Sequence, residues 1–247
     1  MLTMKLLRGS VPAALSVCCA STWAMHPMVT DDTATQGRQR SQIEINTDWV
    51  RGRGYDGRIA DFTYTYGLSD SVDIALDMPS NLSSPAGLND VAIGFKWRFA
   101  EMDGISFAVT PTLALSTGSE QRGLSNGTYN PGAALIGSYA TGSWVWLANV
   151  GIVSNRYRQN ELRAANRAII RRASLAVTYA IDPQWTVVAD TGIAQNMRRS
   201  EQGNPAYFLF GAVYSPNQTI DLDAGIKFGL KNVGPSRQVG VGLTVHF

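Results

Sequence analysis

The last ten residues of the chain, 238–247, alternate strictly between apolar and polar side chains. Val239, Val241, Leu243, Val245 and Phe247 occupy every second position. A period of two residues places these side chains on one face of a strand. Ten residues are also about the length that a tilted strand needs to cross a bilayer. The segment is therefore predicted to be a membrane-crossing strand that ends on an aromatic side chain.

Eleven earlier segments bring the predicted number of strands to twelve. They are residues 42–50, 60–66, 72–78, 90–99, 106–116, 133–139, 144–154, 167–179, 185–193, 206–214 and 220–228. Most of them carry apolar residues on one face only, as a strand between lipid and a hydrated interior requires. Residues 144–154 are apolar on both faces, and the facing of residues 206–214 is ambiguous.

The predicted connections alternate in length. Short turns with Gly, Pro, Asn, Asp or Ser fall near residues 68–71, 101–104, 141–143, 181–184 and 216–218. Longer connections fall near residues 51–57, 80–88, 117–129, 155–166, 196–204 and 231–236. This layout, with an even strand count, favours an outer-membrane barrel over a soluble β-sandwich, which has no reason to alternate its turn lengths. The predicted fold class is therefore all-β, a twelve-stranded antiparallel transmembrane β-barrel of the bacterial outer membrane.

The N-terminus has the features of a secretory signal. Lys5 and Arg8 precede a short apolar stretch, and a run of small residues offers a cleavage site after Ala24. We therefore predict a signal peptide at 1–24, a periplasmic N-terminal arm at 25–40 and a transmembrane barrel at 41–247.

Removal of the signal changes both the cysteine count and the charge. The 2 cysteines of the chain, Cys18 and Cys19, lie inside the signal, so the mature chain has no thiolate for a disulfide or a metal. Lys5 and Arg8 also leave, so 19 basic residues remain of 21, against 19 acidic residues. A neutral chain argues against a nucleic-acid partner.

The start of the arm carries a recognisable motif, directly before the first strand. Its residues are His26, Pro27, Thr30, Asp31, Asp32, Thr35, Gln36 and Gly37. This pattern resembles the start of the family named putative MetA-pathway of phenol degradation, a set of outer-membrane transporter-like barrels. The resemblance implies a channel for small solutes, aromatic or hydrophobic compounds among them, and it supplies no catalytic residue and no cofactor.

The polar faces of the predicted strands would line the pore. The candidate pore-lining residues are Glu44, Asp48, Asp61, Asp73, Asp77, Asp90, Lys96, Arg98, Arg172, Asp190, Asp221, Asp223 and Lys227. An excess of acids in a hydrated lumen favours cations or polar neutral solutes, which are not the solutes that the family resemblance implies. The alternative is a salt-bridged filling that holds the barrel shape. Residues 25–40 could plug either kind of lumen.

Other functions and partners follow from the same model. Phe247 is the expected signal for the outer-membrane assembly machinery, as the resemblance of the last strand to barrel-closing strands implies. Basic residues of the long connections could bind lipopolysaccharide phosphates. A structural or adhesion barrel is the alternative function. A barrel hydrolase is disfavoured, because the chain has only 2 histidines, His26 and His246, and neither is expected near an outer-rim serine. We predict no metal site.

Overall fold

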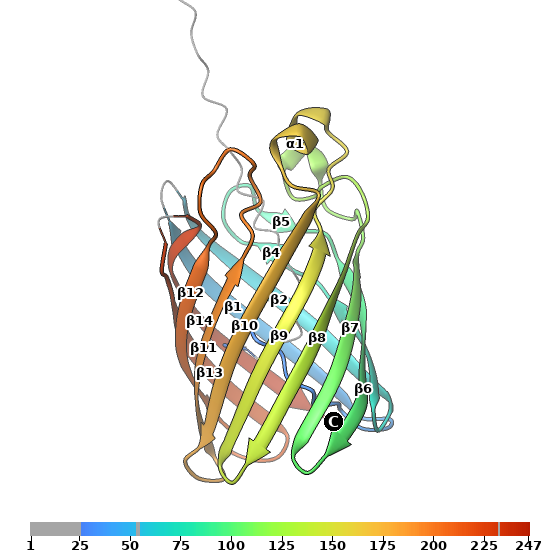
Figure 1. The fold of residues 1–247 in the computed structure, drawn as a ribbon, viewed down its shortest axis with the longest axis vertical. Helices are drawn as coiled ribbons and strands as arrows, with labels where there is room; N and C mark the ends of the chain where they lie inside the picture. The colour runs from blue at the N-terminus through green and yellow to red at the C-terminus, as the bar shows by residue number, and fades with distance from the viewer. Residues whose placement is uncertain (1–25, 53–54, 232) are drawn as a thin grey trace, which may run out of the picture.

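Twelve antiparallel strands form a closed barrel in the computed structural model, which describes residues 26–52, 55–231 and 233–247 (Figure 1). The strands are β1 (Ser41–Gly52), β2 (Tyr55–Ser69), β3 (Val72–Asp77), β6 (Ala92–Met102), β7 (Ile105–Ala114), β8 (Asn130–Thr141), β9 (Trp144–Ser154), β10 (Ile169–Ala180), β11 (Trp185–Ala194), β12 (Ala206–Tyr214), β13 (Ile220–Gly229) and β14 (Pro235–His246). Each strand pairs with its sequence neighbour in the wall. The predicted fold class is confirmed.

The first and last strands close the barrel. β1 pairs with β14 as well as with β2, with Ile43 opposite Val245 and Trp49 opposite Val239. At the end of this seam, the backbones of Ser41 and Phe247 exchange two hydrogen bonds of 2.7 and 2.9 Å. The barrel therefore has no open sheet edge along β1, and the ladder of the seam is regular from Gln42 to Arg51.

Long connections gather at one end of the barrel and short turns at the other (Figure 1). The long connections hold the short strands β4 (Ser80–Asn81) and β5 (Gly87–Leu88), the 3-10 helix η1 (Glu120–Arg122) and the helix α1 (Asn160–Ala165). No helix within the described residues has the length and apolar character of a membrane-spanning helix.

The predicted long connection at 51–57 is wrong. The ladder of β1 and β2 continues to the pair Gly52 and Tyr55, so most of these residues are strand. The alternation of apolar and polar residues is lost among the glycines and arginines of this segment, so its pattern did not indicate a strand. The predicted signal, 1–24, and the first arm residue, Met25, lie outside the described residues.

The outer face of the barrel is apolar. Exposed apolar side chains include Ile45, Trp97, Phe107, Leu135, Trp146, Leu175, Phe210, Leu222 and Val241. So many exposed apolar side chains mark a surface that contacts something other than water. For a closed β-barrel, that medium is the lipid of a membrane. The protein is therefore an outer-membrane barrel, as the alternation of its strands predicted.

Aromatic rings gather on the outer face beside the short turns. The ring centroids of Trp144 and Tyr179 lie 4.5 Å apart, and those of Trp185 and Tyr214 lie 4.7 Å apart. Each pair joins the first residues of one strand to the last residues of its neighbour. Amphipathic rings at this position form the interfacial girdle of an outer-membrane barrel.

Arginines of the long connections bind the loops to one another. Arg158 lies 3.3 Å from Glu120, which joins the connection before β8 to the connection after β9. The guanidinium of Arg199 donates to the carbonyl oxygen of Asn166 at 2.8 Å. These side chains therefore order the outer loops, a role that the sequence pattern did not indicate.

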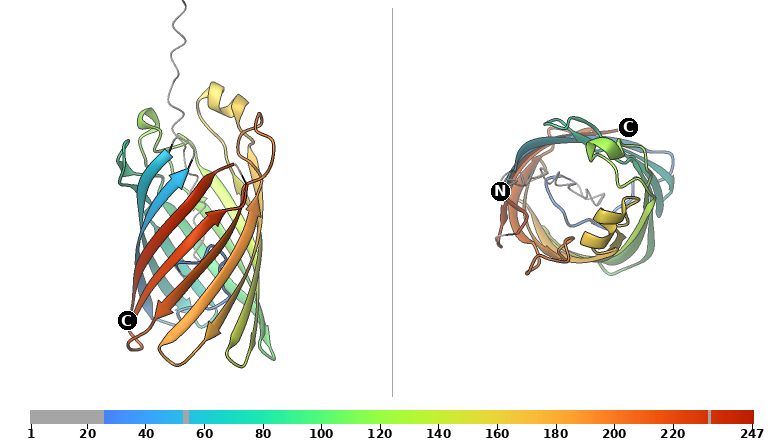
Figure 2. Two further views of the ribbon diagram at one scale, coloured as in Figure 1. Left: turned by 90° about the vertical axis from the view of Figure 1, so that its left-hand side faces the viewer. Right: turned by 90° about the horizontal axis from the view of Figure 1, so that it is seen from above.

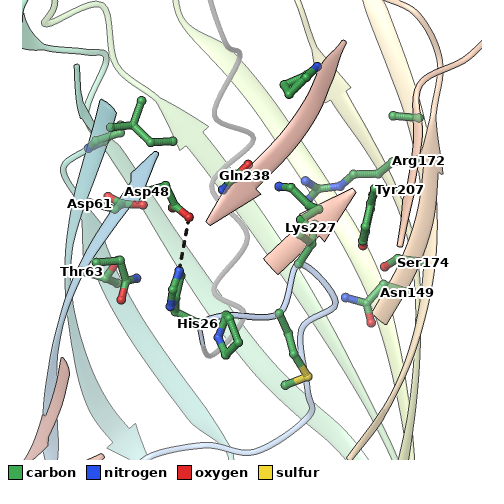
Figure 3. A pocket seen from close by; sticks show the side chains of 18 of the residues that line it. His26, Asp48, Asp61, Thr63, Asn149, Arg172, Ser174, Tyr207, Lys227 and Gln238 are labelled. Carbon is green, nitrogen blue, oxygen red and sulfur yellow. Dashed lines mark ion pairs between the residues drawn. The ribbon is translucent and has the colours of Figure 1, made fainter. Parts of the chain in front are cut away.

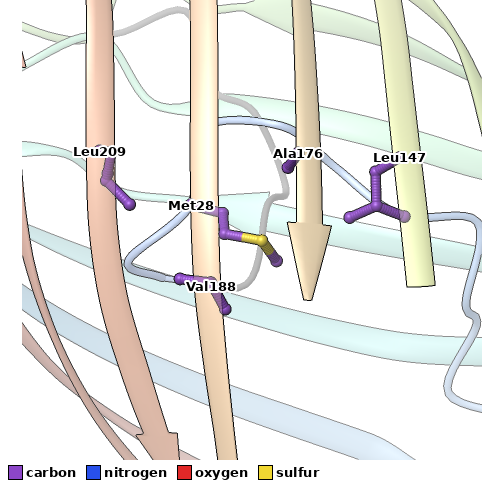
Figure 4. Packing of buried hydrophobic residues seen from close by; sticks show 5 residues of the cluster. All are labelled: Met28, Leu147, Ala176, Val188 and Leu209. Atoms are coloured by element: carbon purple, nitrogen blue, oxygen red, sulfur yellow. The ribbon is translucent and has the colours of Figure 1, made fainter. Parts of the chain in front are cut away.

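A small apolar cluster lies on the inner face of the wall. It explains why the sequence did not show which side chains of residues 144–154 and 206–214 point inward. Leu147 of β9 and Leu209 of β12 point inward, and with Ala176 and Val188 they surround Met28 of the arm (Figure 4). All five residues are buried. Inward apolar residues are tolerated at these places because the arm, and not water, covers them.

Candidate functional site: the lumen and its N-terminal arm

The described part of the arm, residues 26–40, lies inside the barrel (Figure 2). The arm, which was predicted to be periplasmic and able to plug the lumen, contacts the inner faces of the strands around it. It enters beside the turn that joins β2 to β3, where Gln39 donates to the Gly67 carbonyl at 2.9 Å and Gly67 donates to the Arg40 carbonyl at 2.9 Å. The arm is therefore part of the lumen filling.

The arm and the wall touch backbone to backbone at Gly37 and Gly67. A Cβ atom at Gly67 would overlap with the carbonyl group of Gly37, and no side-chain movement could relieve this overlap. We therefore expect Gly67→Ala to displace the arm from the rim, whereas Gly137→Ala on β8, where a Cβ atom would meet only the Phe107 ring at ordinary contact distance, should have no such effect. Protease sensitivity of the arm in the refolded barrel would measure the displacement. Equal protection of the arm in both variants would contradict the contact.

His26 lies among acids of β1 and β13. Its Nδ1 pairs with Asp223, its Nε2 lies 3.6 Å from Asp48 Oδ1, and its backbone N–H donates to Glu44 at 3.3 Å. Burial alone would lower the pKa of His26, but the hydrogen bonds and charges of Asp223 and Asp48 outweigh burial and raise the pKa to about 9. This arm residue is therefore charged at neutral pH and tethers the arm to two strands.

Raising the pH from about 6 to about 10 should loosen this end of the arm. The pairing of the imidazolium is fully present below the unfolded pKa of 6.5 and is lost as the pH rises through about 9. We expect the single-channel current to rise over this interval, and we expect His26→Gln to remove that dependence. A His26→Gln channel with the pH profile of the natural chain would contradict this role.

Asp190 of β11 is the most heavily bonded anchor of the arm. Its carboxylate accepts hydrogen bonds from the backbone N–H groups of Val29 and Thr30 at 2.6 and 2.8 Å. It also accepts from the Thr30 hydroxyl at 2.7 Å and from the Tyr207 hydroxyl at 2.8 Å. Because Asp190 is only 1% exposed, these four donors replace the water that the buried carboxylate would otherwise need.

Lys96 of β6 holds the middle of the arm. Its Nζ lies 2.8 Å from Asp31 Oδ1 and 3.4 Å from Asp32 Oδ1. Asn149 of β9 binds the backbone of Asp31. With its amide oxygen turned toward the arm, Asn149 accepts from the Asp31 N–H at 2.7 Å and donates to the Asp31 carbonyl at 2.9 Å. The Asp31 and Lys96 side chains are almost fully buried, so the ion pair is shielded from solvent.

The rest of the arm is bound mostly by neutral groups. Thr33 contacts the hydroxyls of Ser106 and Ser138, and Gln36 donates its backbone N–H to Asp73 at 3.0 Å. The ring of Pro27 lies over the inner face of β12 and β13, beside glycines. Together with Met28, these contacts join the arm to strands on all sides of the barrel.

Every residue of the family-like motif makes such a contact. His26, Asp31, Asp32 and Gln36 use charge or hydrogen bonds, as described above. The Thr35 hydroxyl donates to the carbonyl of Asp70 at 2.8 Å. The motif that the sequence shows before the first strand is therefore the surface by which the arm fits its own barrel.

The predicted pore-lining residues divide into three groups. Those that hold the arm are Glu44, Asp48, Asp73, Lys96, Asp190 and Asp223. Those that lie elsewhere are Arg98 and Asp221 near the short-turn rim and Asp90 among the outer loops. Of the others, Asp61, Arg172 and Lys227 line the remaining open space, and Asp77 is buried and accepts the hydroxyl of Thr63, which lines that space, at 3.2 Å.

Asp90 needs correction, because it was predicted to lie in a strand. β6 begins at Ala92, and the Asp90 carboxylate accepts backbone N–H groups of Gly118 at 3.1 Å and Asn126 at 3.2 Å. It therefore fixes an outer loop and does not line the middle of the pore. The acidic pairs at Asp31 and Asp32 and at Asp221 and Asp223 bind basic side chains, and the described residues contain no group of three or more His, Cys, Asp or Glu that could hold a metal ion.

A cavity of about 410 Å³ remains beside the arm. Its charged lining includes Asp48 of β1, Asp61 of β2, Arg172 of β10 and Lys227 of β13, and only β14 separates β13 from β1 (Figure 3). Tyr207 lies next to Lys227, whose Nζ is 5.7 Å from the ring centroid. Tyr207 was missed because the strand that carries it has apolar residues on both faces. The lumen therefore offers a small open space whose lining carries charges of both signs.

Comparison with solved structures shows the same fold in outer-membrane channels. The COG4313 outer membrane channel from Pseudomonas putida F1 superposes with a TM-score of 0.66 at 12% identity, over 87% of this chain and 98% of that chain. The NanC porin gives 0.65 at 13% identity, over 82% and 98%. The KdgM porin gives 0.62 at 8% identity, over 83% and 99%. At these identities the likeness establishes the fold.

Comparison by sequence identifies the family. No curated protein sequence matches the chain. The family model described as Putative MetA-pathway of phenol degradation matches residues 26–247, which include the arm and all of the barrel. The resemblance seen in the arm motif is thus confirmed over the mature chain. The chain belongs to the Putative MetA-pathway of phenol degradation family.

Proposed function

We propose that the protein is a passive outer-membrane channel for small solutes, narrowed by its own N-terminal arm. The observation that carries the proposal is the cavity beside the arm, which is enclosed by a closed barrel and lined by charged side chains. A barrel that served only as a scaffold would have no use for an open space lined by charged side chains. The solved channels of the same fold support the proposal.

The structural or adhesion barrel is the second candidate, since the arm fills much of the lumen. Six of the thirteen predicted pore-lining residues hold the arm, as a structural filling would require. The open cavity favours the channel over this alternative. A hydrolase has less support. The His26 side chain binds Asp223, and the His246 side chain binds Asp221. Ser215 donates to Asp221 and not to a histidine, so it lacks the general base that a serine nucleophile needs.

The channel should conduct small ions in discrete steps. In a planar bilayer with a salt gradient, the refolded mature chain is expected to give steps with a reversal potential set by the lumen charges. Arg172→Gln should shift that potential toward cations, because Arg172 lines the cavity and its guanidinium stays charged at every working pH. A folded barrel without conductance would contradict the channel function, and an unchanged potential would exclude Arg172 from the ion path.

The outer end of the barrel also carries groups that suit lipopolysaccharide. Arg51 and Arg237 are cross-strand partners on β1 and β14, and Arg58 of β2 lies opposite Trp49. All three arginines are exposed. We assign them to lipopolysaccharide phosphates, which guanidinium groups bind in bidentate fashion. Phe247, which is 60% exposed at the end of the seam, stays the proposed signal for the assembly machinery.

A further inference from the structure

We propose that the conduction path follows the inner face of the β1–β2 hairpin and that a hydrogen bond between the Gln36 and Gln42 side chains is its narrowest point. This inference rests on the proposed channel function and names the residues that set the size limit of the solute. The side-chain amide of Gln36, in the arm, donates to the side-chain oxygen of Gln42 at 2.8 Å, and both residues line the cavity.

The cavity follows the β1–β2 hairpin along much of its length. The inward residues of β1 that line it are Gln42, Glu44, Asn46 and Asp48. Gln42 is next to Ser41, which bonds to Phe247 at the short-turn end, and from Gln42 to Asp48 the strand rises by about 20 Å. Asp61, Thr63 and Thr65 of β2 line the same space, and Figure 3 shows Asp61 and Thr63 near Asp48. The hairpin therefore offers a solute a continuous polar wall.

The arm closes the lumen on the side of β7 and β8. Thr33 of the arm contacts the hydroxyls of Ser106 and Ser138, which are register partners on these two strands. Ala108 and Ile136, the next inward residues, are fully buried. None of the described residues of β7 or β8 lines the cavity. The open space is therefore displaced toward β1 and β2.

Neutral amides join the arm to the wall at the inner end of this space. The backbone N–H of Gln36 donates to Asp73 of β3 at 3.0 Å, which holds the arm in place while its side chain reaches Gln42. Gln42 in turn donates to Glu44 at 3.4 Å. Water can replace a hydrogen bond between neutral groups at small net cost. The bridge between the two glutamines therefore limits the size of a solute without selecting its charge.

Gln42→Ala should raise the single-channel conductance of the refolded mature chain about twofold, because the missing side-chain atoms leave room for roughly two water molecules at the narrowest point. Gln36→Ala should have the same effect, and it keeps the backbone bond to Asp73. Neutral polyethylene glycols of graded length, added to both chambers of the planar bilayer, measure the size limit, which should rise in both variants. The reversal potential in a salt gradient should stay that of the natural chain, because neither substitution changes a charge.

The matched control is Thr110→Ala on β7. Thr110 is a polar residue of the wall that is 6% exposed, and it does not line the cavity. Its loss should leave the conductance and the size limit unchanged. Single cysteines at the same two positions give a second readout in the folded channel. A cationic methanethiosulfonate reagent should reduce the current through Gln42→Cys, a reducing agent should restore that current, and Thr110→Cys should not respond.

The outcomes distinguish the inference from the function. Equal responses at Gln42 and Thr110, or an unchanged conductance in both glutamine variants, would overturn the proposed path and leave the channel function intact. A shifted reversal potential in Gln42→Ala would overturn the selection by size alone. The absence of conductance from every folded variant and from the natural chain would overturn both the path and the function. Heat-modifiable migration of each variant in electrophoresis shows that its barrel has folded.

Discussion

Deletion of residues 26–40 from the mature chain should raise the single-channel conductance severalfold. The arm crosses the lumen and is bound to β1, β6, β11 and β13, so its removal replaces protein by water along the ion path. Conductance steps of the full chain and of the deleted chain in the same planar bilayer measure the change. Steps of equal height would show that ions do not pass beside the arm.

A reversible tether provides the control that a deletion lacks. The Thr33 and Ser106 hydroxyl oxygens lie 2.5 Å apart, so cysteines at these two positions can join the arm to β7. The only natural cysteines are expected to leave with the signal. Because the arm is already held along its length, we expect the oxidised tether to leave the steps unchanged. Smaller steps on oxidation would show instead that the arm moves aside during conduction.

Replacement of Lys96 by Met should destabilise the folded barrel by about 3–5 kcal/mol, the cost of removing one partner from a buried ion pair. The variant leaves the Asp31 carboxylate almost fully buried without its cation. Urea-induced unfolding in micelles, followed by tryptophan fluorescence, measures the loss.

Arg98→Gln is the matched control for Lys96→Met. Arg98 lies two residues along the same strand and faces the same way, but it pairs at 3.2 Å with Glu101, which is 62% exposed. Its loss should cost less than about 1 kcal/mol, because solvent screens the pair. Lys96→Met with Asp31→Asn and Asp32→Asn should recover part of the stability. Equal stability of Lys96→Met and the natural chain would refute the anchoring role.

The strands of the barrel wall could be predicted because one face of each strand meets lipid and the other meets the polar lumen. Trp97 and Lys96 are adjacent in sequence, yet one is half exposed to lipid and the other is buried in the lumen. Such a contrast between neighbours gives the period of two that identifies each strand. The number of strands was therefore predictable.

The role of those polar residues could not be predicted in the same way. Asp190 binds Thr30, which is 160 residues away in sequence, and no local pattern reveals a partner at that distance. Leu147 and Leu209 look misplaced as lumen residues until Met28 is seen between them. The arm itself has no period, because its residues contact different strands one after another. The sequence therefore offered residues 25–40 as a plug of the lumen but not the contacts by which they fill it.

The seam between β1 and β14 ties closure of the barrel to the arm. Without the pairing of β14 with β1, the sheet would have two free edges, whose unpaired N–H and C=O groups are unsuited to lipid. The arm joins the wall at Ser41, the same residue that bonds to Phe247 across the seam. One residue therefore holds both the closed wall and the point from which the arm extends into the bore.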